Sequence, residues 1–141
     1  MSTINIKARK KSRMLAMQAI YQWQITHDDL ANIQAQFLSH TDNQDIDREY
    51  FKKIVSGVIN TSEKLDQAYQ TYLDRDILDI TPVELSILRL STYELTECLE
   101  IPYKVILNEA VELSKTFGAD ESHKYINGVL DKVATKIRTH E

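Results

Sequence analysis

The stretch from residue 101 to residue 133 constrains the fold most, because it predicts two helices joined by a tight corner. Pro102 suits the first position of a helix, where the backbone N–H that proline lacks would have no helical acceptor. Apolar residues then recur at helical spacing and form one stripe: Ile106, Ala110, Leu113 and Phe117. Gly118 follows at once, in the place that a left-handed residue often takes after a helix.

The second helix of this pair contains Asn127-Gly128, a dipeptide that ordinarily indicates a hairpin turn. Asp120 and Glu121 put negative charge where this helix begins, which its N-terminal dipole favours. The apolar period runs through the dipeptide on both sides: Ile126, Val129, Leu130, Val133 and Ile137. We therefore predict a continuous helix, in which Gly128 allows the close approach of a neighbouring helix.

Helix breakers are scarce in the rest of the chain as well. Three glycines and two prolines make five breakers in 141 residues, whereas average usage is about 12%. Amphipathic stretches predict further helices near 8–26, 30–38, 47–73 and 82–98. The clearest helix start is Thr81-Pro82-Val83-Glu84, which combines a capping box with proline at the first helical position. The sequence therefore predicts a single all-α domain.

Particular residues inside these helices predict particular contacts. Asp47 is expected to cap the third helix, and Gly57 within that helix indicates close packing. Arg89 lies between two leucines and is expected to pair with Glu94 or Glu109, because an unpaired guanidinium near a core is costly.

Charge is distributed unevenly along the chain. The net charge is −4, yet residues 1–27 hold five bases and no acid, so the remainder holds twelve bases against twenty-one acids, or −9. The five bases are Lys7, Arg9, Lys10, Lys11 and Arg13. They lie at the N-terminal end of the first helix, where the macrodipole disfavours cations. This asymmetry predicts a localised anion-binding site, although a solvated basic tail has the same composition.

The sequence contains no motif of a catalytic or metal site. It has no phosphate-binding glycine loop, nucleophile elbow or zinc-ligand cluster. The acidic loop 39–45 lacks the glycine and ligand spacing of a calcium loop. The one cysteine, Cys98, excludes an internal disulfide and is expected to be structural. We predict no catalytic residue, metal or cofactor, no membrane segment and a cytoplasmic location.

Tyrosines add a second kind of binding group to the cations. A tyrosine ring offers a face on which an unpaired base can stack. Tyr21 lies two turns beyond Arg13 on the same helix face, so ring and cations are expected to share one groove. The alternative is that Tyr21 is a core aromatic, and Tyr125 has the same ambiguity.

Four stretches of the chain resemble the NusB family of bacterial transcription antitermination factors. They are AMQAIYQWQ, YFKKIVSGV, VELSILRLSTYEL and ILNEAVELSKTFGADESHKYINGVLDKV. They occur in the family's order over about residues 7–137. Each stretch alone is mostly core helix and is a weak signal, but the four together at matching separations are specific for the family. The resemblance implies an all-α, NusB-like fold of about six to seven helices in two packed bundles, at about 9–73 and 82–138. A flexible basic arm at 1–8 would precede them.

The resemblance also implies a function and its residues. The implied partners are boxA-type single-stranded RNA, the ribosomal protein NusE and the transcription elongation complex, with no membrane, no cofactor and no enzymatic activity. The implied RNA-binding residues are Lys7, Arg9, Lys10, Lys11, Arg13, Tyr21, Glu84, Glu121 and Tyr125. At two positions of the family's arginine-rich motif this chain has lysine, which keeps the charge but loses the planar, bidentate fork.

Two other functions are compatible with these residues. One is an RNA-binding accessory domain of an rRNA methyltransferase, since NusB-like domains occur there, but no cofactor-binding half follows before Glu141. The other is a helical adaptor that binds only proteins and whose basic end is a solvated tail. Salt-dependent RNA binding would distinguish the adaptor from an RNA-binding factor.

Overall fold

The computed structural model describes residues 5–40 and 45–141, which form six α-helices and one short 3₁₀ helix. In chain order these are α1 (Ile6–Thr26), α2 (Leu30–Leu38), α3 (Arg48–Gln70), η2 (Ile77–Asp79), α4 (Pro82–Glu97), α5 (Tyr103–Phe117) and α6 (Ser122–Ile137). The described residues contain no strand, and Asn127-Gly128 lies inside α6. The all-α prediction is confirmed.

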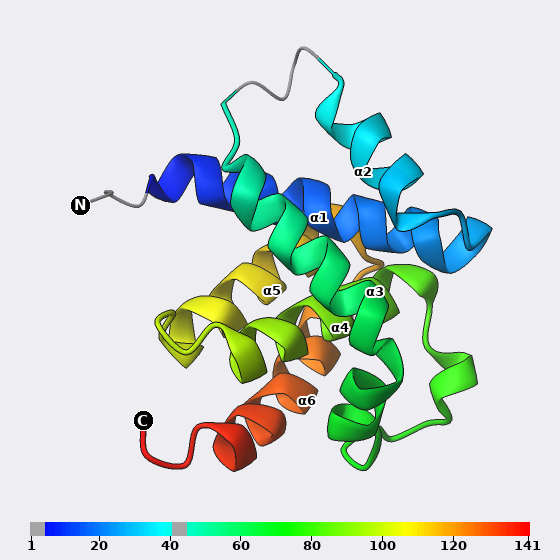
Figure 1. Cartoon of the computed structure of the whole chain (residues 1–141). Coiled ribbons are helices and arrows are strands. Elements are labelled where there is room, and N and C mark those ends of the chain that lie inside the picture. The colour runs from blue at the N-terminus through cyan, green and yellow to red at the C-terminus, as the bar shows by residue number, and fades with distance from the viewer. Residues whose placement is uncertain (1–4, 41–44) are drawn as a thin grey trace.

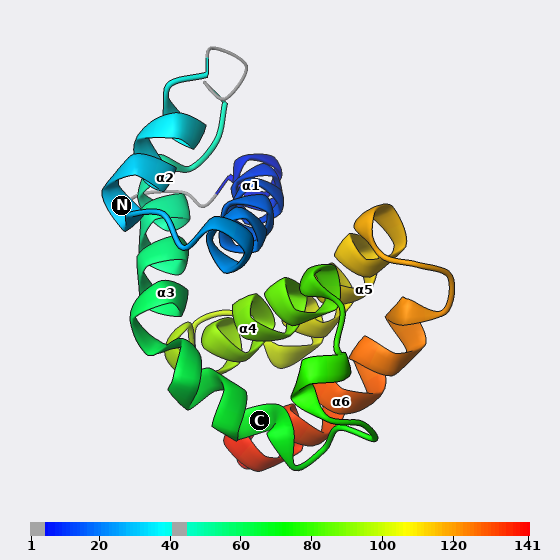
Figure 2. The same ribbon diagram turned by 90° about the vertical axis from the view of Figure 1, so that its right-hand side faces the viewer.

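The helices form two groups that share one apolar core. α1, α2 and α3 pack against one another, and α4, α5 and α6 form the second group (Figures 1 and 2). Both α1 and α3 also lie against α4, which makes α4 the central helix of the molecule. Its middle is apolar on more than one face, as the complete burial of Ile87, Leu88 and Leu90 shows. This arrangement agrees with the two packed bundles that the resemblance implies.

Helix starts follow the local signals in the sequence, with two differences. The Thr81 hydroxyl accepts from the Glu84 N–H at 3.2 Å, and Glu84 accepts from the Thr81 N–H at 3.3 Å, so the predicted capping box is present. Asp47 caps α3 as predicted. Pro102 directly precedes the first residue of α5 instead of occupying that position. α1 begins at Ile6, so residues 6–8 of the expected flexible arm are helical, and residues 1–4 lie outside the described residues.

The prediction for Arg89 is wrong about its partner. Arg89 pairs with Asp66 of α3, at 2.9 Å from Nε to Oδ1 and 2.8 Å from Nη2 to Oδ2, and it also donates to Gln24 of α1. Glu94 lies further along α4 and contacts the opposite end of α1. The burial argument therefore correctly required an acidic partner, but the partner comes from a different helix.

The three glycines differ from one another in their surroundings. A Cβ on Gly57 would overlap the ring of Tyr93 on α4, so close packing there is confirmed. A Cβ on Gly128 would meet no atom within 4 Å, so the expected close approach at that residue is wrong. Gly118 has φ −90°, not the left-handed conformation predicted for it. The left-handed residue at this corner is Glu121, with φ 74°.

Alanine substitutions at Gly57 and Gly128 are therefore expected to change stability in opposite directions. Gly57→Ala should lower the free energy of unfolding by about 1–3 kcal/mol, because the added methyl overpacks the contact with Tyr93. Gly128→Ala should raise it by up to ~1 kcal/mol, because alanine is the better helix former and the space is open. Urea denaturation of the two variants measures both values. A stabilising Gly57→Ala would contradict this packing.

A buried arginine fastens the last helix to the corner between α4 and α5. Arg138 donates to the backbone carbonyls of Leu95 at 2.8 Å, Ile101 at 2.9 Å and Cys98 at 3.1 Å. Leu95 belongs to the last turn of α4, and Cys98 and Ile101 follow this helix. The end of a helix leaves carbonyl acceptors unsatisfied. Cys98 itself is buried, as expected of a structural cysteine, and burial raises the pKa of its thiol.

Candidate nucleic-acid interface

The five predicted cations lie at the N-terminal end of α1, and we call Lys7, Arg9, Lys10, Lys11 and Arg13 together the basic helix end. Their exposure differs widely. The side chains of Lys10 and Lys11 are 54% and 42% exposed, whereas those of Arg9 and Arg13 are 16% and 5% exposed. Lys7 is exposed as well. The lysines therefore face solvent, and the arginines face the protein.

The structure places a carboxylate from elsewhere in the chain beside most of these cations. Lys11 contacts Asp45 at 2.7 Å, and Lys10 lies 4.0 Å from Glu109. The hydrogen bond from Lys11 holds the pKa of Asp45 below its ordinary value. Ion pairs between exposed side chains contribute little to stability, so phosphates can replace these carboxylates at small cost.

Arg13, which the resemblance places among the RNA-binding residues, is part of a buried ion pair. Its Nε and Nη2 lie 3.1 Å and 2.8 Å from the two carboxylate oxygens of Glu94, a residue that is 1% exposed. Tyr50 of α3 also donates its hydroxyl hydrogen to Glu94. Burial disfavours the charged form of Arg13, but Glu94 outweighs this effect and raises the pKa of Arg13 above its ordinary value. Arg13 thus joins α1 to α4, and Glu94 already neutralises its charge within the fold.

Arg9 has a different environment one turn earlier. Its guanidinium carbon lies 3.9 Å from the centroid of the Tyr50 ring, and its Nη2 lies 3.5 Å from Asp47. A guanidinium over an aromatic face is attracted by the ring quadrupole. Arg9 therefore rests on α3, with part of its side chain still open to solvent.

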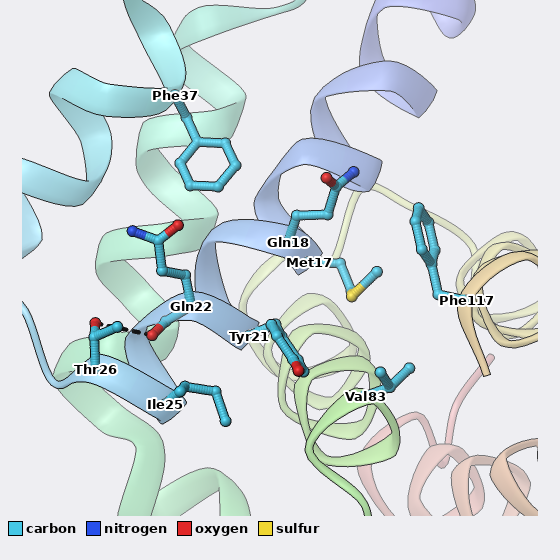
Figure 3. Close-up of a pocket in the computed structure, with 9 residues that line it drawn as sticks. All are labelled: Met17, Gln18, Tyr21, Gln22, Ile25, Thr26, Phe37, Val83 and Phe117. Carbon is cyan, nitrogen blue, oxygen red and sulfur yellow. Dashed lines mark hydrogen bonds between the residues drawn. The ribbon is translucent and has the colours of Figure 1, made fainter. Parts of the chain in front are cut away.

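Tyr21 lines a separate cavity of about 460 Å³ between the two groups of helices (Figure 3). The cavity is lined by Met17, Gln18, Tyr21, Gln22, Ile25, Thr26, Phe37, Val83 and Phe117. Figure 3 shows Tyr21 pointing from α1 toward Val83 of α4, with Phe117 of α5 on the same side of α1. Tyr21 is 39% exposed, so its ring is accessible and is not a core aromatic. No residue of the basic helix end lines this cavity, so the predicted shared groove is not present.

Glu84 is buried in the first turn of α4. It is 6% exposed, and besides closing the capping box it accepts a hydrogen bond from the Ser122 hydroxyl at 3.0 Å. Glu84 thereby joins the starts of α4 and α6. Its observed contacts are structural ones.

The other two predicted residues lie at the start of α6 and are accessible. Glu121 is exposed and pairs with Lys124 at 2.8 Å. Tyr125 has the guanidinium of Arg75 over its ring, 4.2 Å from the centroid, and Arg75 also contacts Asp74 at 2.9 Å. The contact of Arg75 with Tyr125 was not predicted from the sequence. Arg75 lies in the connector before η2, where no helical period places side chains on a common face.

The described residues hold neither a metal-binding cluster nor a membrane-spanning helix. The part of the chain at 5–40 and 45–141 has no group of three or more His, Cys, Asp or Glu side chains placed to hold a metal ion. Residues 41–44 of the acidic loop lie outside the described residues. None of the described helices is both long and apolar enough to span a membrane.

Comparison with known proteins gives the family. A model described as the NusB family matches residues 10–135 of this chain. The chain belongs to the NusB family. The resemblance seen in the four sequence stretches is therefore confirmed.

Individual NusB proteins match over nearly their whole length. The transcription antitermination protein NusB of Idiomarina loihiensis is 50% identical over 131 residues, which is 93% of this chain and 94% of that protein. The structure of T. maritima NusB superposes with a TM-score of 0.82 at 27% identity, covering 96% of this chain and 94% of that one. The curated relatives are named for antitermination, which agrees with the prediction that the chain is not an enzyme.

A further solved structure shares the fold. It is a crystal structure of the antitermination factors NusB and NusE in complex with dsRNA. The match has a TM-score of 0.80 at 24% identity and covers 94% of this chain and 99% of that chain. At this identity the likeness establishes the fold alone.

Proposed function

We propose that this chain is a transcription antitermination factor of the cytoplasm that binds boxA-type single-stranded RNA together with NusE, as part of a transcription elongation complex. The observation that carries the proposal is the basic helix end, in a chain of the NusB family. Lys7, Lys10 and Lys11 face solvent there, and Arg9 is partly open. RNA phosphates would supply the negative charge that this helix terminus lacks.

Aromatic residues favour an unpaired RNA strand as the ligand. Single-stranded RNA is bound by stacking of its bases on aromatic rings and by cations along its backbone. Tyr21 and Tyr125 present partly exposed rings, and Arg75 over Tyr125 adds a cation. The solved complex contains a double-stranded RNA, so our proposal for this chain differs from that ligand in strandedness.

Charge also explains the need for a protein partner. Beyond residue 27 the chain carries a net charge of −9, from twelve bases and twenty-one acids, and this acidic body repels a polyanion. In addition, carboxylates already neutralise part of the basic helix end. A partner that adds contact surface should therefore strengthen RNA binding.

Thermodynamic linkage makes this partnership testable. If NusE raises the affinity for boxA RNA by some factor, boxA RNA must raise the affinity for NusE by the same factor. Fluorescence anisotropy would measure RNA affinity with and without NusE, and calorimetry would measure NusE affinity with and without RNA. We expect equal factors greater than one. NusE affinity that does not change when RNA is added would contradict the proposed ternary complex.

A further inference from the structure

Tyr50 is a buried aromatic residue that lies directly beneath the basic helix end. It belongs to the first turn of α3 and is 4% exposed. The guanidinium carbons of Arg9 and Arg13 lie 3.9 Å and 5.8 Å from its ring centroid. A single ring from α3 therefore contacts both arginines of the cluster.

The ring of Tyr50 is held by a residue of α4, and its backbone is held by the N-cap of α3. The Tyr50 hydroxyl donates to Glu94 of α4, which also holds Arg13. Burial, followed by the nearby charge of Glu94, raises the pKa of Tyr50 well above its ordinary range, so the hydroxyl remains a donor. At the other end, the Tyr50 backbone N–H donates to Asp47 at 3.1 Å, and Asp47 also contacts Arg9. The same turn of α3 thus supplies the ring and the carboxylate that hold Arg9.

The cation types in the basic helix end match this geometry. Arginine occupies positions 9 and 13, which face Tyr50, whereas lysine occupies positions 10 and 11, which face solvent. A planar guanidinium stacks on an aromatic face, and a lysine ammonium is a point charge on a flexible stem. Stacking on the Tyr50 ring needs the planar guanidinium of arginine, whereas either arginine or lysine can neutralise a phosphate.

We propose that Tyr50 is a positioning residue for RNA binding: its ring holds the Arg9 guanidinium flat, in a fixed orientation for a phosphate. This inference rests on the RNA binding proposed above. A side chain that is already ordered loses less conformational freedom when it binds, and the saving appears as affinity. Arg9 should therefore contribute more to the RNA affinity than each exposed lysine does, because its side chain is already ordered.

The test exchanges arginine and lysine at constant charge. We expect Arg9→Lys to weaken binding of boxA RNA about threefold to tenfold, which is the range of a partly desolvated cation–π contact, without changing the salt dependence. The matched variant Lys10→Arg should stay within about twofold of the wild type, because position 10 faces solvent and makes no cation–π contact with an aromatic ring of the described residues. Position 9 faces α3 and position 10 faces solvent, so urea denaturation of both variants checks that the fold is kept. An Arg9→Lys protein that binds as well as the wild type overturns the inference.

Variants of Tyr50 test whether the loss of RNA affinity in Arg9→Lys depends on the aromatic ring. Tyr50→Phe keeps the ring, so Arg9→Lys should weaken RNA binding in that background by the same factor as in the wild type. Tyr50→Leu removes the ring. In this background, once circular dichroism has shown a folded protein, Arg9→Lys should leave the RNA affinity unchanged. If Arg9→Lys weakened RNA binding by the same factor in the Tyr50→Leu and wild-type backgrounds, the inference would be overturned. If the wild type itself showed no salt-dependent RNA binding, the proposed function would fail, whereas salt-dependent binding with neutral Arg9→Lys would remove only the role of Tyr50.

Discussion

Replacement of Glu94 by glutamine is expected to lower the free energy of unfolding by about 3–5 kcal/mol, the cost of leaving one member of a buried ion pair without its partner. Arg13 and Glu94 are 4% and 1% exposed, and two nitrogens of Arg13 contact the carboxylate. Glutamine keeps the size of the side chain and removes the charge that holds the guanidinium. Urea denaturation followed by circular dichroism measures the loss.

Two controls separate this effect from a general sensitivity of the helices. Glu112→Gln, on the exposed side of α5, should change stability by less than ~0.5 kcal/mol. Replacing the whole network with apolar side chains, as Arg13→Met, Glu94→Leu and Tyr50→Phe, should recover much of the loss, because buried ion pairs exchanged for packed apolar groups are often neutral. A loss below ~1 kcal/mol for Glu94→Gln would mean that the ion pair does not anchor α1.

Replacing Arg9, Lys10 and Lys11 with alanine is expected to weaken RNA binding about a hundredfold at ~0.1 M salt. Each phosphate contact by a cation adds roughly −0.7 to the log–log salt slope for a single strand, so losing three contacts flattens the slope by about two units. Fold stability should change little, because the ion pairs of these residues lie at or near the surface. Anisotropy titrations at several salt concentrations measure affinity and slope together.

Tyr21→Ala is the matched control for this triple variant. It should lower the affinity by the worth of a stacked base, about 1–3 kcal/mol, and leave the salt slope unchanged, because stacking releases no counterions. If the triple-alanine protein kept both its affinity and its slope, the basic helix end would be a solvated surface without a binding role.

Features with local causes could be predicted from the sequence. The capping box at Thr81 and the cap at Asp47 involve residues three apart, and both are present. The scarcity of helix breakers acts along the whole chain, and it predicted the all-α fold. A glycine inside an amphipathic helix is costly, and it led to a correct prediction of close packing at Gly57 but to a wrong one at Gly128, where the space is open.

Pairings between distant segments could not be predicted in the same way. Arg13 and Glu94 are 81 residues apart, and Arg89 and Asp66 come from different helices. One signal was nevertheless present in the sequence. Arg13 precedes Ala16 by three residues and Ile20 by seven, so it continues the buried stripe of α1. The charge of Arg13 suggested a surface role, and its position in the helical period indicated burial.

The kink in α3 was not predicted, although its cause is local. Thr61 has φ −129° and ψ 22°, which are not helical values, and its hydroxyl donates to the Gly57 carbonyl at 2.6 Å. A threonine that bonds back to the preceding turn bends a helix in some contexts. The apolar period continues past this point, and for this reason the pattern predicted one uninterrupted helix.

The salt dependence of boxA RNA binding by the wild-type protein tests the central claim most directly. Four cations of the basic helix end remain available once Arg13 is assigned to Glu94, and four contacts predict a log–log slope of about −2.8. A slope near −3.5 would instead require Arg13 to leave Glu94 and bind a fifth phosphate. Binding that is independent of salt, or that is absent both with and without NusE, would contradict RNA recognition by this helix end.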